Sequence, residues 1–168
     1  MSITNITDCD GTITTNSFEV YRNLPGISLE GDPKTVIFKY MKYMKNNGGV
    51  EKYLSLVKEN LKYRKELIEY LKNKNQVYII SDNPFVKELI PPELRNCEGV
   101  YSTIVPEIVG GKFTGEILKD YTKVDIIKNH LPEPNGNKIN FHTDGGLSDE
   151  ELIKYLRDNY ENVNVIRY

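Results

Sequence analysis

SITNITDCDGT, residues 2–12, joins a short, partly alternating stretch to two closely spaced aspartates, Asp8 and Asp10. The stretch predicts a strand, which places both aspartates at its carboxyl end, where open α/β sheets bind ligands. Carboxylates two residues apart on a strand point to the same side and repel each other, unless a cation lies between them or the two have different roles. The alternative is an aspartate-rich turn in which Gly11 supplies an unusual backbone angle.

The rest of the chain alternates predicted strands with predicted helices. Apolar runs flanked by turn-forming residues predict strands at residues 76–81, 99–105, 138–143 and 162–167. Helical spacing and terminal signals predict helices at residues 63–74, 84–90, 121–131 and 148–159. We expect Pro84 at the first helical position of its helix and Ser148 as the N-cap of the last helix. The repeated strand-then-helix order predicts an α/β fold, with a Rossmann-like, mostly parallel sheet flanked by helices.

One segment interrupts this alternation directly after the first strand. Between residues 18 and 61 no convincing strand is found, and two helices are predicted at 34–46 and 50–60. We therefore expect a small helical cap over residues 18–61, inserted into an α/β core formed by residues 1–17 and 62–168. An apolar stripe on the first cap helix is expected to pack on a neighbouring helix; it comprises Val36, Ile37, Tyr40, Met41 and Met44. Farther along, two apolar runs flank Gly110-Gly111 and predict a β-hairpin over residues 104–117.

Composition limits the classes of partner. The net charge of −2 gives no reason to expect nucleic acid, and no apolar run approaches the ~18 residues of a membrane span. The N-terminus lacks a basic region followed by an apolar one, so a cytoplasmic location is expected. Two cysteines do not make a disulfide framework, and we expect Cys9 to pack in the core. Residues 34–74 carry a net charge of +7, from ten lysines and one arginine against four glutamates. This charge indicates either ordinary solvated helix faces or a basic surface that attracts an anionic substrate.

A second pair of carboxylates follows another predicted strand. Asp144 and Asp149 lie in the turn after residues 138–143. Four carboxylates at two strand ends form an oxygen-rich site that suits Mg²⁺ better than zinc, since no cysteine and histidine ligand set is visible. Alternatively, Asp149 only supplies negative charge to the start of a helix. His142, just before this turn, is expected to pack near the site without a catalytic role.

Two further positions suggest an anion site. Ser81 ends the strand at 76–81, and Asp82 and Asn83 lead into a helix, whose first backbone N–H groups are free to bind an anion. An N-capping serine needs no ligand, however, so this signal is weak alone. Lys123 stands near the start of the helix at 121–131, where a cation is unfavourable unless it reaches a phosphate or a carboxylate. Lys119 is a competing choice for the same role.

The order of these residues resembles the motifs of the haloacid dehalogenase superfamily, and the resemblance covers most of the chain. The motif residues are Asp8, Asp10, Gly11, Thr12, Ser81, Lys123, Asp144 and Asp149. The helical insertion and the hairpin before the lysine are similar to those of the branch typified by phosphoserine phosphatase. The resemblance implies that Asp8 is a nucleophile that forms an aspartyl phosphate, and that Asp10 is the general acid and base. It implies that Ser81, Asp82 and Lys123 hold the phosphoryl group. It also implies that Mg²⁺ is bound by Asp8, Asp144 and Asp149, together with Asp10 through its backbone carbonyl.

Several positions depart from the pattern of that branch. Thr143 replaces a glycine, Ser148 replaces an asparagine, and Asp82-Asn83 replaces a pair of glycines. Glu19 is the nearest counterpart of a substrate-binding glutamate but is displaced by two residues. These departures argue against phosphoserine as the specific substrate. We expect a Mg²⁺-dependent phosphatase for a small phosphorylated metabolite; the alternatives are a phosphotransferase or phosphomutase of the same superfamily, or a binding protein without activity.

Overall fold

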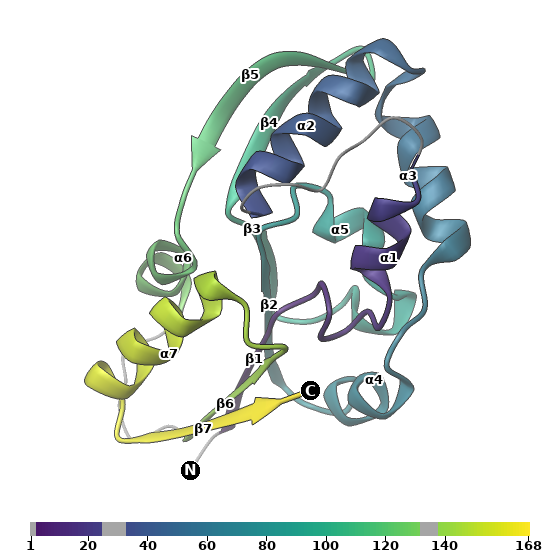
Figure 1. Ribbon diagram of the computed structural model, residues 1–168. Coiled ribbons are helices and arrows are strands. Elements are labelled where there is room, and N and C mark those ends of the chain that lie inside the picture. The colour runs from purple at the N-terminus through teal and green to yellow at the C-terminus, as the bar shows by residue number, and fades with distance from the viewer. Residues whose placement is uncertain (1–2, 25–32, 132–137) are drawn as a thin grey trace.

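A five-stranded sheet forms the centre of the molecule (Figure 1). The structure is a computed structural model that describes residues 3–24, 33–131 and 138–168. The strands are β1 (Ile3–Thr7), β2 (Gln76–Ser81), β3 (Gly99–Ser102), β6 (Lys138–Thr143) and β7 (Asn162–Arg167). Their order is β3-β2-β1-β6-β7, and every neighbouring pair is parallel. The predicted Rossmann-like α/β fold is therefore confirmed, and β1 lies where the strand order changes direction, the usual ligand site of such sheets.

Helices cover both faces of this sheet because its buried strands are apolar on both sides. Helices α6 (Lys123–His130) and α7 (Leu147–Asn159) pack on one face, against Ile6, Ile80 and Phe141. Helix α4 (Lys65–Leu71), the short helix α5 (Val86–Leu89) and the 3₁₀ turn Pro92–Leu94 pack on the other, against Val77 and Ile79. Ile79 and Ile80, which are consecutive, thus belong to opposite cores, as the two-residue period of a strand requires.

Two helix starts differ from the expectation. Helix α7 begins at Leu147 with Gly146 as its N-cap, because the Gly146 carbonyl already accepts from the backbone N–H of Asp149 at 3.0 Å; Ser148 lies inside the helix. Helix α5 begins at Val86 and not at Pro84. The Asn83 side chain accepts from the backbone N–H of Phe85 at 2.9 Å and holds that segment in a turn.

The predicted strand at 99–105 is divided in the structure. Strand β3 ends at Ser102, whose hydroxyl donates to the Ile104 carbonyl at 2.7 Å and accepts from the Ile104 N–H at 3.1 Å. The chain then leaves the sheet and enters strand β4 (Ile104–Val109), which pairs antiparallel with β5 (Lys112–Asp120). This is the predicted hairpin, and Gly110 and Gly111 form its turn with φ of +57° and +74°. Glycine adopts this left-handed conformation without strain.

The insertion between β1 and β2 consists of α1 (Ser17–Arg22), α2 (Pro33–Asn46) and α3 (Gly49–Asn60). The hairpin packs against this insertion: the Val50 N–H donates to the Gly111 carbonyl at 3.1 Å, and the Lys45 ammonium donates to the Thr114 carbonyl at 2.9 Å. Figure 1 shows these helices and the hairpin together at one end of the molecule. We call this group, α1 to α3 with β4 and β5, the cap. The division of the chain at residues 18 and 61 stays a prediction.

Tyr40, Met41 and Met44 of the apolar stripe on α2 are buried. They belong to an apolar core that α2 shares with α1, α3 and the hairpin. These side chains therefore pack on neighbouring helices, as expected. They also pack on the hairpin, which was not expected. None of the described helices is long and apolar enough to span a membrane. Cys9 and Cys97 are both free thiols, and Cys9 is buried as expected.

Candidate active site at the carboxyl end of the sheet

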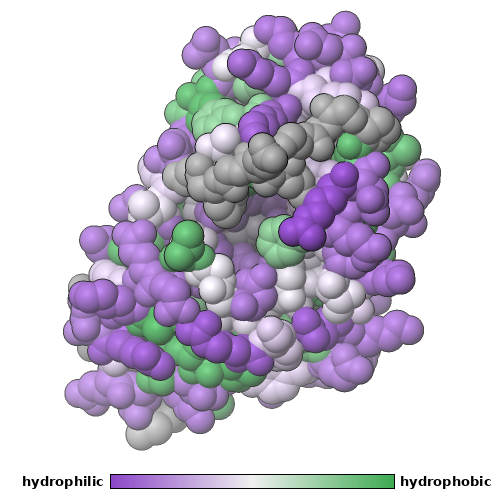
Figure 2. All heavy atoms as spheres, in the orientation of Figure 1, coloured by the Kyte–Doolittle hydropathy of each residue, from purple (hydrophilic) through white to green (hydrophobic). Residues whose placement is uncertain are grey.

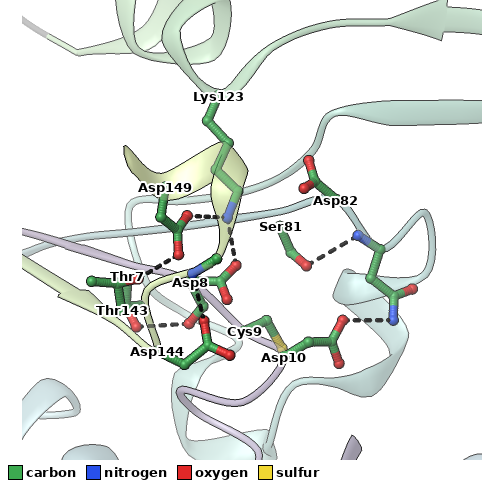
Figure 3. Close-up of polar contacts among 12 residues, drawn as sticks. Thr7, Asp8, Cys9, Asp10, Ser81, Asp82, Lys123, Thr143, Asp144 and Asp149 are labelled. Carbon is green, nitrogen blue, oxygen red and sulfur yellow. Dashed lines mark hydrogen bonds and ion pairs between the residues drawn. The ribbon is translucent and has the colours of Figure 1, made fainter. Parts of the chain in front are cut away.

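Three carboxylates converge where β1 and β6 end. Asp8 follows β1, Asp144 follows β6, and Asp149 lies in the first turn of α7. Their neighbouring strands bring them together, since β1 and β6 pair in register and the Asp8 N–H donates to the His142 carbonyl at 3.0 Å. One oxygen from each carboxylate lies within 4.8 Å of the others. Of the four carboxylates predicted to meet at these two strand ends, the structure therefore brings three side by side (Figure 3), and Asp10 has other partners.

Lys123 lies among these carboxylates. Its ammonium is 2.7 Å from Asp8 Oδ1 and 2.5 Å from Asp149 Oδ1, and its side chain is buried. It opens helix α6, which Thr122 caps through a reciprocal capping box with Asp125. Lys119, the competing choice, is an exposed residue of β5 whose ammonium lies 5.9 Å from the centre of the Tyr121 ring. The structure thus brings Lys123, and not Lys119, to the carboxylates.

The contacts of Thr143 give a physical reason for the threonine that stands where the expected motif has glycine. Its hydroxyl donates a short hydrogen bond to Asp149 Oδ2, while Asp149 Oδ1 accepts from Lys123. Both oxygens of this buried carboxylate are therefore satisfied. A glycine at position 143 would offer no such donor, so the threonine fixes the orientation of Asp149.

The site is crowded with negative charge. Burial raises the pKa of Asp8; the ammonium of Lys123 opposes the rise, and the carboxylate of Asp149 adds to it. Burial also raises the pKa of Asp144, again with a contribution from Asp149. For Lys123, burial alone would lower the pKa, but the carboxylates of Asp8 and Asp149 more than offset it, so the pKa is raised. When ionised, three carboxylates and one ammonium leave two negative charges, which a divalent cation would neutralise.

Gly11 permits the close approach of Asp144. Its φ is +78°, and a Cβ built on it would lie 2.2 Å from Asp144 Oδ2. Any side chain at this position would therefore be strained and would displace the Asp144 carboxylate. The glycine that the sequence suggested for a turn is thus needed for both its backbone angle and its missing side chain.

Asp10 is held apart from the other carboxylates. Its Oδ1 accepts from the Tyr21 hydroxyl at 2.9 Å, and its Oδ2 accepts from the Asn83 amide at 3.2 Å. The Asn83 amide also donates to the Tyr21 hydroxyl at 2.7 Å, which closes a three-residue network. Burial raises the pKa of Asp10, while the hydrogen bonds from Tyr21 and Asn83 oppose the rise. Asp8 and Asp10 therefore have different partners, as the opening pair of like charges suggested.

The sequence does not identify Tyr21 and Asn83 as site residues. Asn83 is expected only as part of a helix start, and nothing in the local sequence of Tyr21 distinguishes it from a core tyrosine. Glu19, the predicted counterpart of a substrate-binding glutamate, is exposed on α1 and is not among the residues that line the cavity described below. Phe18, Tyr21 and Arg22 of the same helix line that cavity instead.

Ser81 and Asp82 lie at the end of β2, beside the carboxylates (Figure 3). The buried Ser81 hydroxyl accepts from the Asn83 N–H at 3.1 Å. Asp82 is oriented by the Thr103 hydroxyl, which donates to its Oδ1 at 2.7 Å. Both residues face the same cavity as Asp8 and Lys123. His142, by contrast, packs between the rings of Tyr70 and Tyr168 outside the cavity, and burial lowers its pKa to about 4.

A cavity of about 230 Å³ lies between these residues and the cap. Its lining includes the polar residues Asp8, Asp10, Ser81, Asp82, Asn83, Lys123, Asp144 and Asp149. The sequence matches no protein-family model, and no curated protein matches it either.

Proposed function

We propose that the protein is a Mg²⁺-dependent phosphomonoester phosphatase of the haloacid dehalogenase type. The observation that supports this best is the pairing of two carboxylates with different environments in one cavity. Asp8 is held by Lys123 beside Asp144 and Asp149, whereas Asp10 is held separately by Tyr21 and Asn83. An unprotonated nucleophile and a separate proton donor are what ester cleavage through a covalent intermediate requires.

The residues present suit Mg²⁺. Carboxylate oxygens from Asp8, Asp144 and Asp149 are hard ligands, and they lie close enough to share one ion. The nearby Cys9 is a poor ligand for zinc, because burial raises the pKa of its thiol and keeps it protonated. A bound Mg²⁺ would neutralise charge on the carboxylates and on the phosphoryl group. The backbone carbonyl of Asp10 remains the predicted further ligand.

The first chemical step forms a bond from an Asp8 carboxylate oxygen to phosphorus. The ester P–O bond breaks, its electron pair stays on the alcohol oxygen, and Asp10 supplies the proton that completes the alcohol. In the second step a water molecule gives a proton to Asp10 and its oxygen attacks the same phosphorus. The bond from phosphorus to Asp8 then breaks, which releases inorganic phosphate and restores the carboxylate.

The other polar groups of the cavity hold the phosphoryl oxygens. The ammonium of Lys123 lies 2.7 Å from Asp8 Oδ1, so it is close to any phosphorus bonded to Asp8. Its positive charge would stabilise the charge that spreads over the phosphoryl oxygens in the transition state. The Ser81 hydroxyl supplies a second polar contact from the end of β2.

The proposal is tested by phosphate release from p-nitrophenyl phosphate. We expect activity with Mg²⁺, loss of it with excess EDTA, and recovery when Mg²⁺ is restored. Release that EDTA leaves unchanged would overturn the metal-dependent mechanism. Absence of release from this ester and from a broad set of natural phosphate esters would favour a binding protein without activity.

Substitution of Gly11 tests the geometry of the metal ligands. Gly11→Ala should lower the free energy of unfolding by about 1–3 kcal/mol through backbone strain. It should also weaken Mg²⁺ binding by about tenfold or more, because the new methyl group displaces Asp144. Gly110→Ala is the matched control, since Gly110 also has positive φ but has no atom within 4 Å of the added Cβ. Calorimetry that finds equal Mg²⁺ affinity in the two variants would exclude a ligand role for Asp144.

A further inference from the structure

The cavity has a polar end and an apolar end. The polar end is formed by the carboxylates, Lys123 and Ser81 described above. The other end is formed by side chains of the cap and of the segment after β2: Phe18, Val36, Ile37, Tyr40, Met41, Met44, Tyr53 and Phe85. The buried members of this set are Tyr40, Met41, Met44, Tyr53 and Phe85. A substrate with its phosphate at the polar end must therefore place its alcohol part against the apolar end.

Two of the described hydrogen-bonding side chains near the apolar end, Tyr40 and Asn83, already have partners. The Tyr40 hydroxyl donates a short hydrogen bond to the Tyr21 carbonyl. The Asn83 amide donates to Asp10 and Tyr21, and its oxygen accepts from the Phe85 N–H. Among the described residues that line the cavity, the one cation besides Lys123 is Arg22, which is exposed on α1. An ammonium group or several hydroxyls placed against this wall would lose water and would gain few hydrogen bonds from the described side chains, which is unfavourable.

The size of the cavity limits the alcohol further. Its volume of about 230 Å³ is below the roughly 300–1,000 Å³ typical of pockets for drug-sized ligands. A single ring or a short chain fits inside this volume, whereas a nucleoside or a long lipid chain would have to extend past the open edge of the cavity. The thioethers of Met41 and Met44 are adaptable and favour contact with aromatic rings.

Apolar side chains are also exposed at the edges of the cavity. Phe18 of α1 is 47% exposed and Leu147 of α7 is 83% exposed, and both line the cavity. On the face shown in Figure 2, hydrophilic side chains predominate, and apolar side chains are visible in several areas. Covering Phe18 and Leu147 with an apolar group would remove apolar surface from water, which is favourable.

We propose that the alcohol part of the substrate is a small, uncharged group with an aromatic or aliphatic body. This inference rests on the proposed phosphatase function and names the substrate class of the same site. It excludes amino-acid, sugar and nucleoside phosphates as preferred substrates. The basic charge of the segment 34–74 then contributes to attraction of the phosphate and not to recognition of the alcohol.

A panel of phosphate compounds tests this inference, with kcat/KM as the measured quantity. From ethyl to butyl phosphate, kcat/KM should rise about fourfold for each added methylene group. Benzyl phosphate should exceed phosphoserine and glycerol phosphate by about 100-fold or more. Acetyl phosphate, which is small and reactive, reports the catalytic groups without engaging the apolar wall.

The panel separates failure of the inference from failure of the proposed function. If acetyl phosphate is hydrolysed through Asp8 but phosphoserine or glycerol phosphate matches benzyl phosphate, the substrate class is overturned and the phosphatase stands. If no compound is hydrolysed, acetyl phosphate included, the phosphatase is overturned and the substrate class falls with it.

A single substitution on the apolar wall gives an independent test. Val36 is half-buried on α2, and Val36→Thr keeps its shape while adding a hydroxyl to the wall. We expect kcat/KM for benzyl phosphate to fall about tenfold, while that for acetyl phosphate changes by less than about twofold. Val109→Thr, at a position of β4 that is 64% exposed and outside the cavity, should change neither value. Unchanged hydrolysis of benzyl phosphate in Val36→Thr, or an equal loss with both compounds, would overturn the proposal.

Discussion

Replacing Asp8 with asparagine is expected to lower kcat for phosphate release by about 10⁴-fold or more. An amide is a far weaker nucleophile than a carboxylate, so the bond to phosphorus would not form. The fold should persist, because asparagine has nearly the same shape and Lys123 keeps its contact with Asp149. The measurement is single-turnover phosphate release with Mg²⁺, alongside thermal unfolding of both proteins.

A matched control for this variant is Asp158→Asn. Asp158 is an exposed carboxylate on α7 that pairs with Lys154 at 2.9 Å. It is not among the residues that line the cavity. Its loss should leave kcat unchanged and alter the free energy of unfolding by less than about 0.5 kcal/mol. Retention of more than a tenth of the activity in Asp8→Asn would exclude Asp8 as the nucleophile.

Replacing Lys123 with methionine is expected to lower the free energy of unfolding by about 3–5 kcal/mol in the absence of metal. The variant leaves the buried carboxylates of Asp8 and Asp149 without the ammonium that lies 2.7 Å and 2.5 Å from them. Since removal of this cation raises the pKa of Asp8 further above its unfolded value, the loss should be greatest near pH 8. It should shrink toward pH 5, where the carboxyl is protonated in the folded state.

The measurement is denaturant unfolding at both pH values, with EDTA and with Mg²⁺. Mg²⁺ should restore part of the stability, because it binds the same carboxylates in the folded state. Lys119→Met, at an exposed position of β5, is the matched control and should change stability by less than about 0.5 kcal/mol. A Lys123→Met protein as stable as the wild type in EDTA at pH 8 would show that the buried charges do not depend on this lysine.

Local sequence patterns were sufficient for most of the core. Strands β2, β6 and β7 have the predicted bounds, because each is a short apolar or β-branched run between turn-forming residues. Because parallel α/β sheets adopt a restricted set of strand orders, the proximity of Asp8 to Asp144 could also be predicted. Helix starts were less predictable, because hydrogen bonds from Gly146 and Asn83 decide where α7 and α5 begin.

The contacts of the cap could not be predicted in the same way. Helix α1 is only six residues long, and its Tyr21 reaches Asn83, which is 62 residues away in the chain. The hairpin was predicted from its glycine turn, but its packing on α2 and α3 depends on the apolar stripe of α2 meeting β5 in three dimensions. Such contacts depend on the tertiary arrangement, and the apolar end of the cavity arises from them.

The most direct test of the account is to trap the phosphoryl group on Asp8. Wild type and Asp10→Asn would be quenched in acid during turnover of p-nitrophenyl phosphate, and their peptides analysed by mass spectrometry. Because p-nitrophenolate leaves without a proton donor, Asp10→Asn should still form the intermediate but hydrolyse it slowly. We predict a phosphoryl group on the peptide that contains Asp8, at higher occupancy in Asp10→Asn than in the wild type. Turnover of the ester with Asp8 unmodified in both proteins, or with the phosphoryl group on another residue, would contradict the account.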